Sequence, residues 1–259
     1  MSTHEFEWKA GDGLKIYAQA WETDAQPKAV ISLVHGLGEH SGRYAWVAET
    51  LNQGGYAVIA SDLRGHGQSG GKRGHSPSFN AFMDDIAVLL SETAARYPGL
   101  PCFLWGHSLG GLLVSNYILR RKPQLKGVVI TSPGFRTAVA DQKMKIRLAS
   151  ILGKLLPEMS MPTGLDAKLI SRDPAVVERY VKDPLVHSTA TLAMAKYTVE
   201  AIPYVYEHAG EWLLPLLLMH GDADALAYVS GSEQLASLIK QDCTLKIWPG
   251  LWHETHNEP

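Results

Sequence analysis

Gly106-His107-Ser108-Leu109-Gly110-Gly111 is a G-x-S-x-G pattern between a strand-like and a helix-like segment. The run Cys102–Trp105 before it is short and apolar, and Leu109–Arg121 after it is typical of a helix that stops before Pro123. A serine on such a sharp turn exposes its hydroxyl above the sheet, and only tiny neighbours let the backbone turn so tightly. The pattern makes Ser108 a candidate nucleophile and indicates a hydrolase. The alternative is a glycine-rich turn that carries an inert serine.

The composition is that of an ordinary globular protein. The 259 residues suffice for one large α/β domain or two small ones, and 46% of them are apolar. The net charge of −2 gives no overall basic character, so we expect no nucleic-acid partner. Cys102 and Cys243 are too few for a disulfide framework. The sequence shows neither a membrane-spanning apolar run nor a signal peptide, which predicts a cytoplasmic protein.

Short apolar runs alternate with helical patterns along most of the chain. The start, Phe6–Lys9 and Leu14–Ala18 around Gly11-Asp12-Gly13, predicts a hairpin. Six further strands are predicted at Ala29–Val34, Tyr56–Ala60, Cys102–Trp105, Gly127–Thr131, Pro215–Met219 and Leu245–Trp248. Helices are predicted at Tyr44–Asn52, Phe79–Tyr97, Leu109–Arg121 and Ser232–Lys240. This alternation favours an α/β fold, with a mostly parallel central sheet flanked by helices on both faces.

The alternation stops between about Arg136 and Ala209. Prolines divide this stretch into short helices, and no strand is evident. We therefore expect residues 136–209 to form a helical cap (lid), inserted after the sixth strand into a core of residues 1–135 and 210–259. An insertion at the carboxyl end of a parallel strand lies over the crevice where α/β sheets bind ligands. The cap is thus expected to cover the active site.

A serine nucleophile needs a base to take its proton and a carboxylate to orient that base. On such a sheet the three groups follow strands in the order serine, acid, histidine. Asp222 and Asp224 both follow the strand Pro215–Met219. We favour Asp224, because the loop must travel a few residues to reach the histidine, and keep Asp222 as the alternative. His253 follows the turn after the last strand and is the candidate base, with His256 as the alternative.

Acyl transfer also needs hydrogen-bond donors aimed at the developing oxyanion. One is the backbone N–H of Leu109, the residue after the nucleophile. The second is expected from Leu37, in the loop His35–His40 that follows a predicted strand. The flanking Gly36 and Gly38 would let the Leu37 N–H point inward. The alternative is that these glycines only form a turn.

Three other patterns resemble cofactor or metal sites but lack the residues or the spacing that those sites need. Gly65–Gly70 fits G-x-G-x-x-G, but more glycines and Pro77 follow where a helix should hold a pyrophosphate. The segment after Asp222 lacks the ligand and glycine positions of a calcium loop. His253 and His256 are spaced by three, whereas a zinc-binding helix needs a spacing of about four. The sequence therefore predicts neither a cofactor nor a metal.

Taken together, these segments resemble the monoacylglycerol lipase and lysophospholipase-like family of α/β-hydrolases. The resemblance rests on His35–Tyr44, Asp62–Ser69, Gly106–Gly111, His220–Asp224 and Gly250–Glu254. It implies a triad of Ser108, Asp224 and His253, and an oxyanion hole formed by Leu37 and Leu109. It also implies hydrolysis of esters of one long fatty acid, without a cofactor, under a cap that forms an acyl tunnel.

The chain departs from this family pattern at two places. After Asp224 the family usually has a basic residue and soon a second carboxylate, where this chain has Ala225 and Tyr228. Family members also usually carry a further helix after the base. This chain ends at Pro259, six residues after His253, so we expect a trimmed carboxyl terminus.

One predicted cap helix, residues 143–156, is amphipathic. Its apolar face consists of Met144, Leu148, Ile151, Leu152 and Leu155. A separate basic stripe consists of Lys143, Arg147 and Lys154. Such a helix beside an active site predicts transient contact with a membrane surface, from which it would draw in a monoester. The alternative is a cap helix that covers the pocket and keeps its lysines in solvent.

The sequence therefore predicts a serine ester hydrolase that cleaves single-chain fatty acyl esters, with a small-molecule lipid ester as substrate. A lysophospholipase, a thioesterase or a peptidase on the same triad is the alternative. A non-catalytic receptor for an apolar ligand is an alternative from another class, because a fold alone does not fix a function. The expected location is cytoplasmic and peripheral to a membrane.

Overall fold

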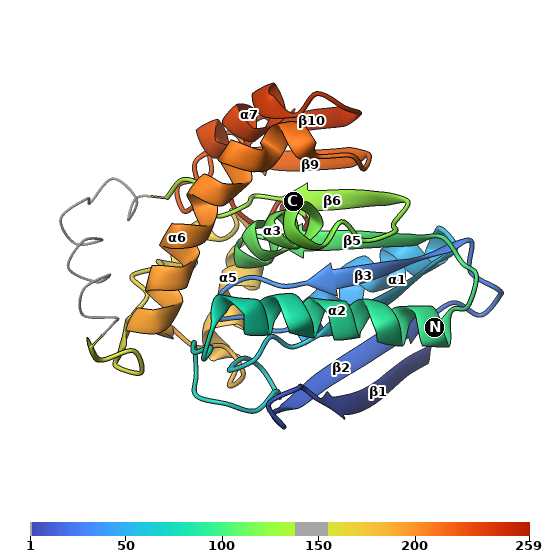
Figure 1. Cartoon of the computed structure of the whole chain (residues 1–259), viewed down its shortest axis with the longest axis horizontal. Coiled ribbons are helices and arrows are strands. Elements are labelled where there is room, and N and C mark those ends of the chain that lie inside the picture. Colours follow the sequence, from blue (N-terminus) through green and yellow to red (C-terminus); the bar gives the residue numbers. More distant parts are fainter. Residues whose placement is uncertain (1, 138–154) are drawn as a thin grey trace.

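A computed structural model describes residues 2–137 and 155–259 of the chain. Within these ranges an eight-stranded sheet has the order β1-β2-β4-β3-β5-β6-β9-β10 (Figure 1). Its strands are β1 (Ser2–Lys9), β2 (Lys15–Glu22), β3 (Ala29–Val34), β4 (Tyr56–Ser61), β5 (Cys102–His107), β6 (Gly127–Thr131), β9 (Leu216–Gly221) and β10 (Cys243–Trp248). The β1–β2 hairpin joins β4 in antiparallel fashion, and the strands from β4 to β10 pair in parallel. The predicted mostly parallel sheet is confirmed.

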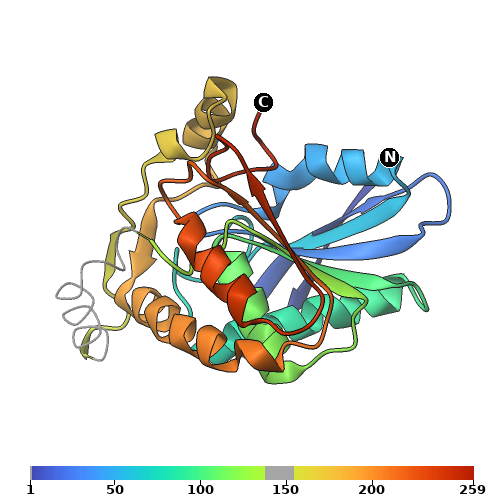
Figure 2. The ribbon, with the colours of Figure 1, turned by 90° about the horizontal axis from the view of Figure 1, so that it is seen from above.

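Helices cover both faces of the sheet, as predicted (Figure 2). One face carries α1 (Ala45–Gln53), and the other carries α2 (Phe79–Arg96), α3 (Leu109–Arg121), α6 (Leu192–His208) and α7 (Val229–Leu238). Trp21, Tyr44 and Trp105 belong to the buried cluster on the α1 side. Phe82, Leu112 and Val205 belong to the larger cluster on the opposite side. The continuous apolar strands are therefore buried from both sides.

The strand order creates a crevice between two loops. The chain leaves β3 toward β4 on one side of it, and later returns to place β5 on the other side. When the loops after two neighbouring parallel strands run in opposite directions, a gap opens between the loops at the carboxyl ends of those strands. This gap is where α/β sheets bind ligands. The loop after β3 contains Leu37, and the turn after β5 contains Ser108. The topology alone thus brings two predicted parts of the site together.

The segment between β6 and β9 differs from its prediction. Besides η2 (Ala167–Leu169) and α5 (Pro174–Lys182), it contains β7 (Ser160–Pro162) and β8 (Thr189–Thr191), which pair antiparallel. The prediction that this segment has no strand is wrong, because three-residue strands are too short to show an alternating pattern. The predicted amphipathic helix falls on residues 143–154, which lie outside the described residues, and on Leu155 and Leu156.

Candidate active site

The turn between β5 and α3 holds Ser108 in an unusual backbone conformation. Ser108 has φ 53° and ψ −114°, which costs a residue with a side chain about 1–3 kcal/mol. Its N–H donates to the Thr131 carbonyl at 3.0 Å. A Cβ at Gly110 would overlap the Val34 carbonyl oxygen, and one at Gly106 would lie 2.5 Å from the Gly110 carbonyl oxygen. The two glycines of the pattern are therefore required by the close approach of the backbone.

The structure brings Ser108, His253 and Asp224 together in one hydrogen-bonded chain. His253 Nε2 lies 2.9 Å from Ser108 Oγ, and His253 Nδ1 lies 2.7 Å from Asp224 Oδ2. Because an ionised carboxylate only accepts, His253 carries its proton on Nδ1 and presents Nε2 to the hydroxyl as an acceptor. Asp224 is 6% exposed and His253 is 7% exposed, so both partners are shielded from water.

The loop that carries Asp224 is organised by backbone donors. Asp224 Oδ1 accepts the N–H groups of Leu226 and Ala227 at 2.8 and 2.9 Å. Its Oδ2 also lies 3.1 Å from His220 Nε2, at the end of β9. The departure from the family pattern at Ala225 and Tyr228 therefore leaves Asp224 with three protein contacts besides His253.

The charges of this pair reinforce each other. Burial by itself would raise the pKa of Asp224, but the facing His253 and His220 hold that pKa well below its ordinary value. Burial acts to lower the pKa of His253, and the Asp224 carboxylate outweighs this effect and raises it. The result is a carboxylate that stays ionised beside an imidazole of increased basicity.

The two alternative residues lie elsewhere. Asp222 Oδ1 accepts the N–H of Gly250 at 2.6 Å and so belongs to the turn after β10. The His256 ring stacks on Tyr44, with ring centroids 5.0 Å apart, and meets His107 edge-on at 4.8 Å. Burial lowers the pKa of His256 to about 4. A neutral packing role accounts for His256.

The two predicted oxyanion donors flank Ser108. Leu109 is the first residue of α3, so its N–H has no partner within the helix. A Cβ at Gly36 would lie 3.2 Å from Ser108 Cβ, which shows how closely the loop of Leu37 approaches Ser108. Gly36 N–H donates to Glu39 Oε1 at 2.6 Å, and this hydrogen bond fixes the conformation of the loop. Within residues 2–137 and 155–259, the N–H groups of Leu37 and Leu109 have no protein acceptor.

A buried ion network beside the triad was missed from the sequence. Arg43 Nη1 and Nη2 donate to the two carboxylate oxygens of Glu254 at 2.6 and 2.7 Å. Arg43 Nη1 also donates to Glu39 Oε2 at 2.7 Å. Both carboxylates are 3% exposed. Glu39 and Arg43 stand in the His35–Tyr44 motif, and Glu254 follows His253 directly, so the motif marked these residues without indicating that they pair.

Residues 166–187 are hydrogen-bonded to both loops of the site. One of these loops is His35–His40, called the oxyanion loop from here on. Its contacts are His187 N–H to the Gly38 carbonyl and His40 Nε2 to Asp183 Oδ2, both 2.8 Å. The other loop is the segment after β10 that contains His253, called the base loop from here on. In this loop, Glu254 N–H donates to the Ile170 carbonyl at 2.8 Å. The Ser171 hydroxyl donates to the Asn257 carbonyl at 3.0 Å. This segment is therefore an integral wall of the site.

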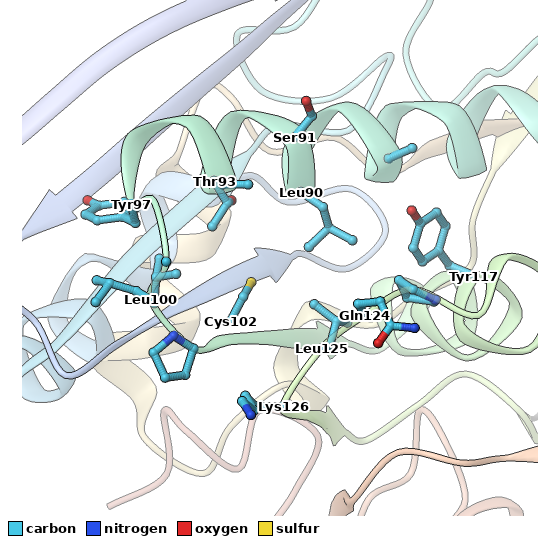
Figure 3. Close-up of a pocket in the computed structure, with 16 residues that line it drawn as sticks. Leu90, Ser91, Thr93, Tyr97, Leu100, Cys102, Tyr117, Gln124, Leu125 and Lys126 are labelled. Atoms are coloured by element: carbon cyan, nitrogen blue, oxygen red, sulfur yellow. The ribbon is translucent and has the colours of Figure 1, made fainter.

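The cavity at Ser108 is lined from both sides. Ser108 and His253 contribute from the sheet, and Leu165, Ile170 and Tyr180 contribute from the segment between β6 and β9. A separate cavity of about 530 Å³ lies at the opposite, amino end of β5, where Leu90, Cys102 and Leu125 line it (Figure 3). No triad residue lines this second cavity.

Comparison with known proteins identifies the family. Residues 25–259 match the Hydrolase_4 model, described as "Serine aminopeptidase, S33". A monoacylglycerol lipase from Mycolicibacterium smegmatis is 37% identical over 95% of this chain and 89% of its own length. An uncharacterized abhydrolase domain-containing protein from Dictyostelium discoideum is also 37% identical over 93% of this chain, which spans 26% of that longer protein. The crystal structure of the Paleococcus ferrophilus monoacylglycerol lipase has a TM-score of 0.86 at 37% identity, covering 94% of this chain and 92% of that one. The chain therefore belongs to the monoacylglycerol lipase and lysophospholipase-like family of α/β-hydrolases, and it is a serine ester hydrolase.

Proposed function

We propose that the protein hydrolyses monoacylglycerols and similar single-chain fatty acyl esters through an acyl-enzyme on Ser108. The observation that carries this proposal is the hydrogen-bonded chain from Ser108 Oγ through His253 to Asp224. The substrate class is supported by the relatives named monoacylglycerol lipase, which match nearly the whole chain at 37% identity.

In the proposed reaction, His253 Nε2 takes the proton of Ser108 Oγ as the oxygen attacks the ester carbonyl. Asp224 remains ionised and stabilises the resulting imidazolium. The N–H groups of Leu37 and Leu109 donate to the oxyanion of the tetrahedral intermediate. His253 then gives its proton to the departing glycerol oxygen, which leaves an acyl group on Ser108. Water, activated by the same imidazole, releases the fatty acid and restores the hydroxyl.

We further propose that residues 136–209 act as a cap over a core of residues 1–135 and 210–259. The support comes from Leu165, Ile170 and Tyr180, which line the same cavity as Ser108. These side chains offer an apolar wall for the acyl chain and reduce the access of water to the reacting ester.

A hydrolysis panel tests the function. It compares monoacylglycerols of graded acyl length with lysophosphatidylcholine, acyl-coenzyme A and aminoacyl anilides. We expect the highest kcat/KM for a monoacylglycerol, and no turnover or fluorophosphonate labelling in Ser108→Ala. Preferred cleavage of an anilide would make the protein a peptidase. Labelling without turnover of any ester would favour a receptor, and esterase activity retained by S108A would refute the assignment of the nucleophile.

We also propose transient contact with a membrane surface beside the site. Leu155, Leu156 and Met159 lie within five residues of the chain and expose 73%, 52% and 54% of their surface. No helix within the described ranges is long and apolar enough to cross a membrane. Sedimentation with anionic vesicles at low salt tests it. We expect Leu155→Asp to reduce the bound fraction. Leu213 is similarly exposed, at 68%, and Leu213→Asp should leave the bound fraction unchanged. Absence of binding by the wild-type protein would contradict the proposal.

A further inference from the structure

Arg43, in η1 (Ser41–Tyr44), occupies a position shared by the two loops that build the site. Glu39 belongs to the oxyanion loop (His35–His40) and fixes its conformation, because its Oε1 accepts Gly36 N–H at 2.6 Å as well as the Tyr44 hydroxyl at 2.8 Å. Glu254 adjoins the base in the chain. Arg43 Nη1 contacts both carboxylates, 2.7 Å from Glu39 and 2.6 Å from Glu254. One guanidinium thus links the loop of the oxyanion donors to the loop of the base.

The surroundings leave Arg43 little freedom to move. Its side chain is 10% exposed, and its guanidinium lies over the Tyr180 ring of α5, 4.6 Å from the centroid. A planar fork that makes two parallel bonds to a carboxylate fixes orientation as well as distance. A lysine at this position would keep the charge but could not reproduce the fork.

Arg43 also balances the charge around the base. Several titratable and charged groups surround His253. They are Asp224 after β9, His107 at the end of β5, Glu39 before η1, Arg43 within η1, Tyr180 of α5, and Glu254 and His256 in its own segment. Without Arg43, the buried carboxylates of Glu39 and Glu254 would lose the cation that pairs with both of them. Burial would raise the pKa of Glu39, and Arg43 is the main group that holds this pKa low.

We propose that Arg43 is a positioning residue for ester hydrolysis. It fixes the oxyanion loop against the base loop and neutralises the two carboxylates beside His253. This inference rests on the proposed function, because it assumes that His253 is the base for Ser108. Arg43 itself touches neither residue and acts through Glu39 and Glu254.

The geometric part is tested with Arg43→Lys. Rates are expressed per active site, counted by stoichiometric fluorophosphonate labelling of Ser108, so that misfolded protein is not counted. We expect kcat per labelled site to fall about 10- to 100-fold, because small misplacements of reacting groups are costly. KM should stay within about threefold, because a positioning defect acts on the transition state rather than on ground-state binding.

The electrostatic part of the proposal is tested with the pH profile of kcat/KM, at the acid limb where activity falls as the pH is lowered. Arg43→Gln should move this limb upward by up to about one pH unit, because a carboxylate that stays ionised without its cation favours the imidazolium, whereas one that takes up a proton does not. The double variant Arg43→Gln with Glu254→Gln removes one charge of each sign and should return the limb toward the wild-type position. R43K keeps the cation, and its limb should stay in place.

Arg64 supplies a matched control. It is a second buried arginine, 3% exposed, whose guanidinium donates to both oxygens of Asp85 at 2.7 and 2.9 Å. Neither residue lines the cavity at Ser108. Arg64→Lys should lower the urea midpoint of unfolding, and leave kcat per labelled site and the acid limb unchanged.

The outcomes separate this proposal from the proposed function. If R43K lowers only the urea midpoint, as R64K does, and R43Q leaves the acid limb in place, Arg43 is a structural residue and the inference fails. If fluorophosphonate does not label Ser108 in the wild-type protein, the proposed nucleophile fails instead.

Discussion

Arg43 and Glu254 form a two-point contact across 211 positions of the chain, with nitrogen–oxygen distances of 2.6 and 2.7 Å. Ser108 and His253 meet across 145 positions. The site thus depends on pairs that join the first half of the sequence to the residues after β10. These residues follow three strands, with Arg43 after β3, Ser108 after β5, and His253 and Glu254 after β10. The parallel sheet aligns those strand ends at one edge.

The two aspartates after β9 should differ sharply in their effect on catalysis. Asp224→Asn removes the carboxylate that fixes the His253 tautomer, and we expect kcat to fall about a thousandfold or more. Asp222→Asn weakens one bond to a turn and should leave kcat close to the wild-type value. Steady-state hydrolysis of a monoacylglycerol by both purified variants measures the difference. Equal losses of kcat in the two variants would show that the assignment of Asp224 as the acid is wrong.

The acid limb of the wild-type profile should lie above pH 6.5, the ordinary pKa of a histidine. His253 must be neutral to accept the serine proton, and the Asp224 carboxylate raises its pKa. Activity is therefore present above this raised pKa and is lost as the pH falls through it. Rates with an uncharged chromogenic ester across the pH range provide the measurement. A midpoint below that of free histidine would show that the carboxylate does not control the base.

Gly110 should tolerate no side chain. A Cβ there would overlap the Val34 carbonyl oxygen, so Gly110→Ala should destabilise the protein by at least about 2 kcal/mol. Gly11 lies in an open turn with nothing within 4 Å of an added Cβ, and Gly11→Ala should change stability by less than about 0.5 kcal/mol. Urea unfolding followed by tryptophan fluorescence compares the two. Similar stabilities would mean that the turn has room to open.

Thr131 should contribute stability through its hydroxyl. It accepts Trp105 Nε1–H at 3.1 Å and lies 3.0 Å from His107 Nδ1, with all three residues buried. Thr131→Val keeps the shape but leaves buried ring nitrogens without a partner, at a cost of about 1–3 kcal/mol. Thr50→Val, on the exposed surface of α1, is the control and should change little. A stable T131V variant would indicate that another acceptor takes over.

The sequence predicted the features that have a local signature. Val-, Ile- and Leu-rich runs marked the parallel strands, and the residues after three of them supplied Ser108, Asp224 and His253. The β7–β8 pair was missed, because Ser160–Pro162 is a three-residue strand with all of its residues exposed. The contact of Arg43 with Glu254 has no local signature at all. Its two members lie in separate motifs, and only the closed fold brings their charges together.

The bonds of residues 166–187 to the base loop have a consequence for folding. Ser171 meets Asn257, and Arg172 meets Glu258, each across 86 positions. Contacts between distant positions form late, since the chain must lose the entropy of a long loop before it gains the contact. We therefore expect the base loop to reach Ser108 only after β10 has joined the sheet and this segment has docked. During refolding, esterase activity should return after the circular dichroism signal of the helices. The recovery of activity would then report the last step of folding.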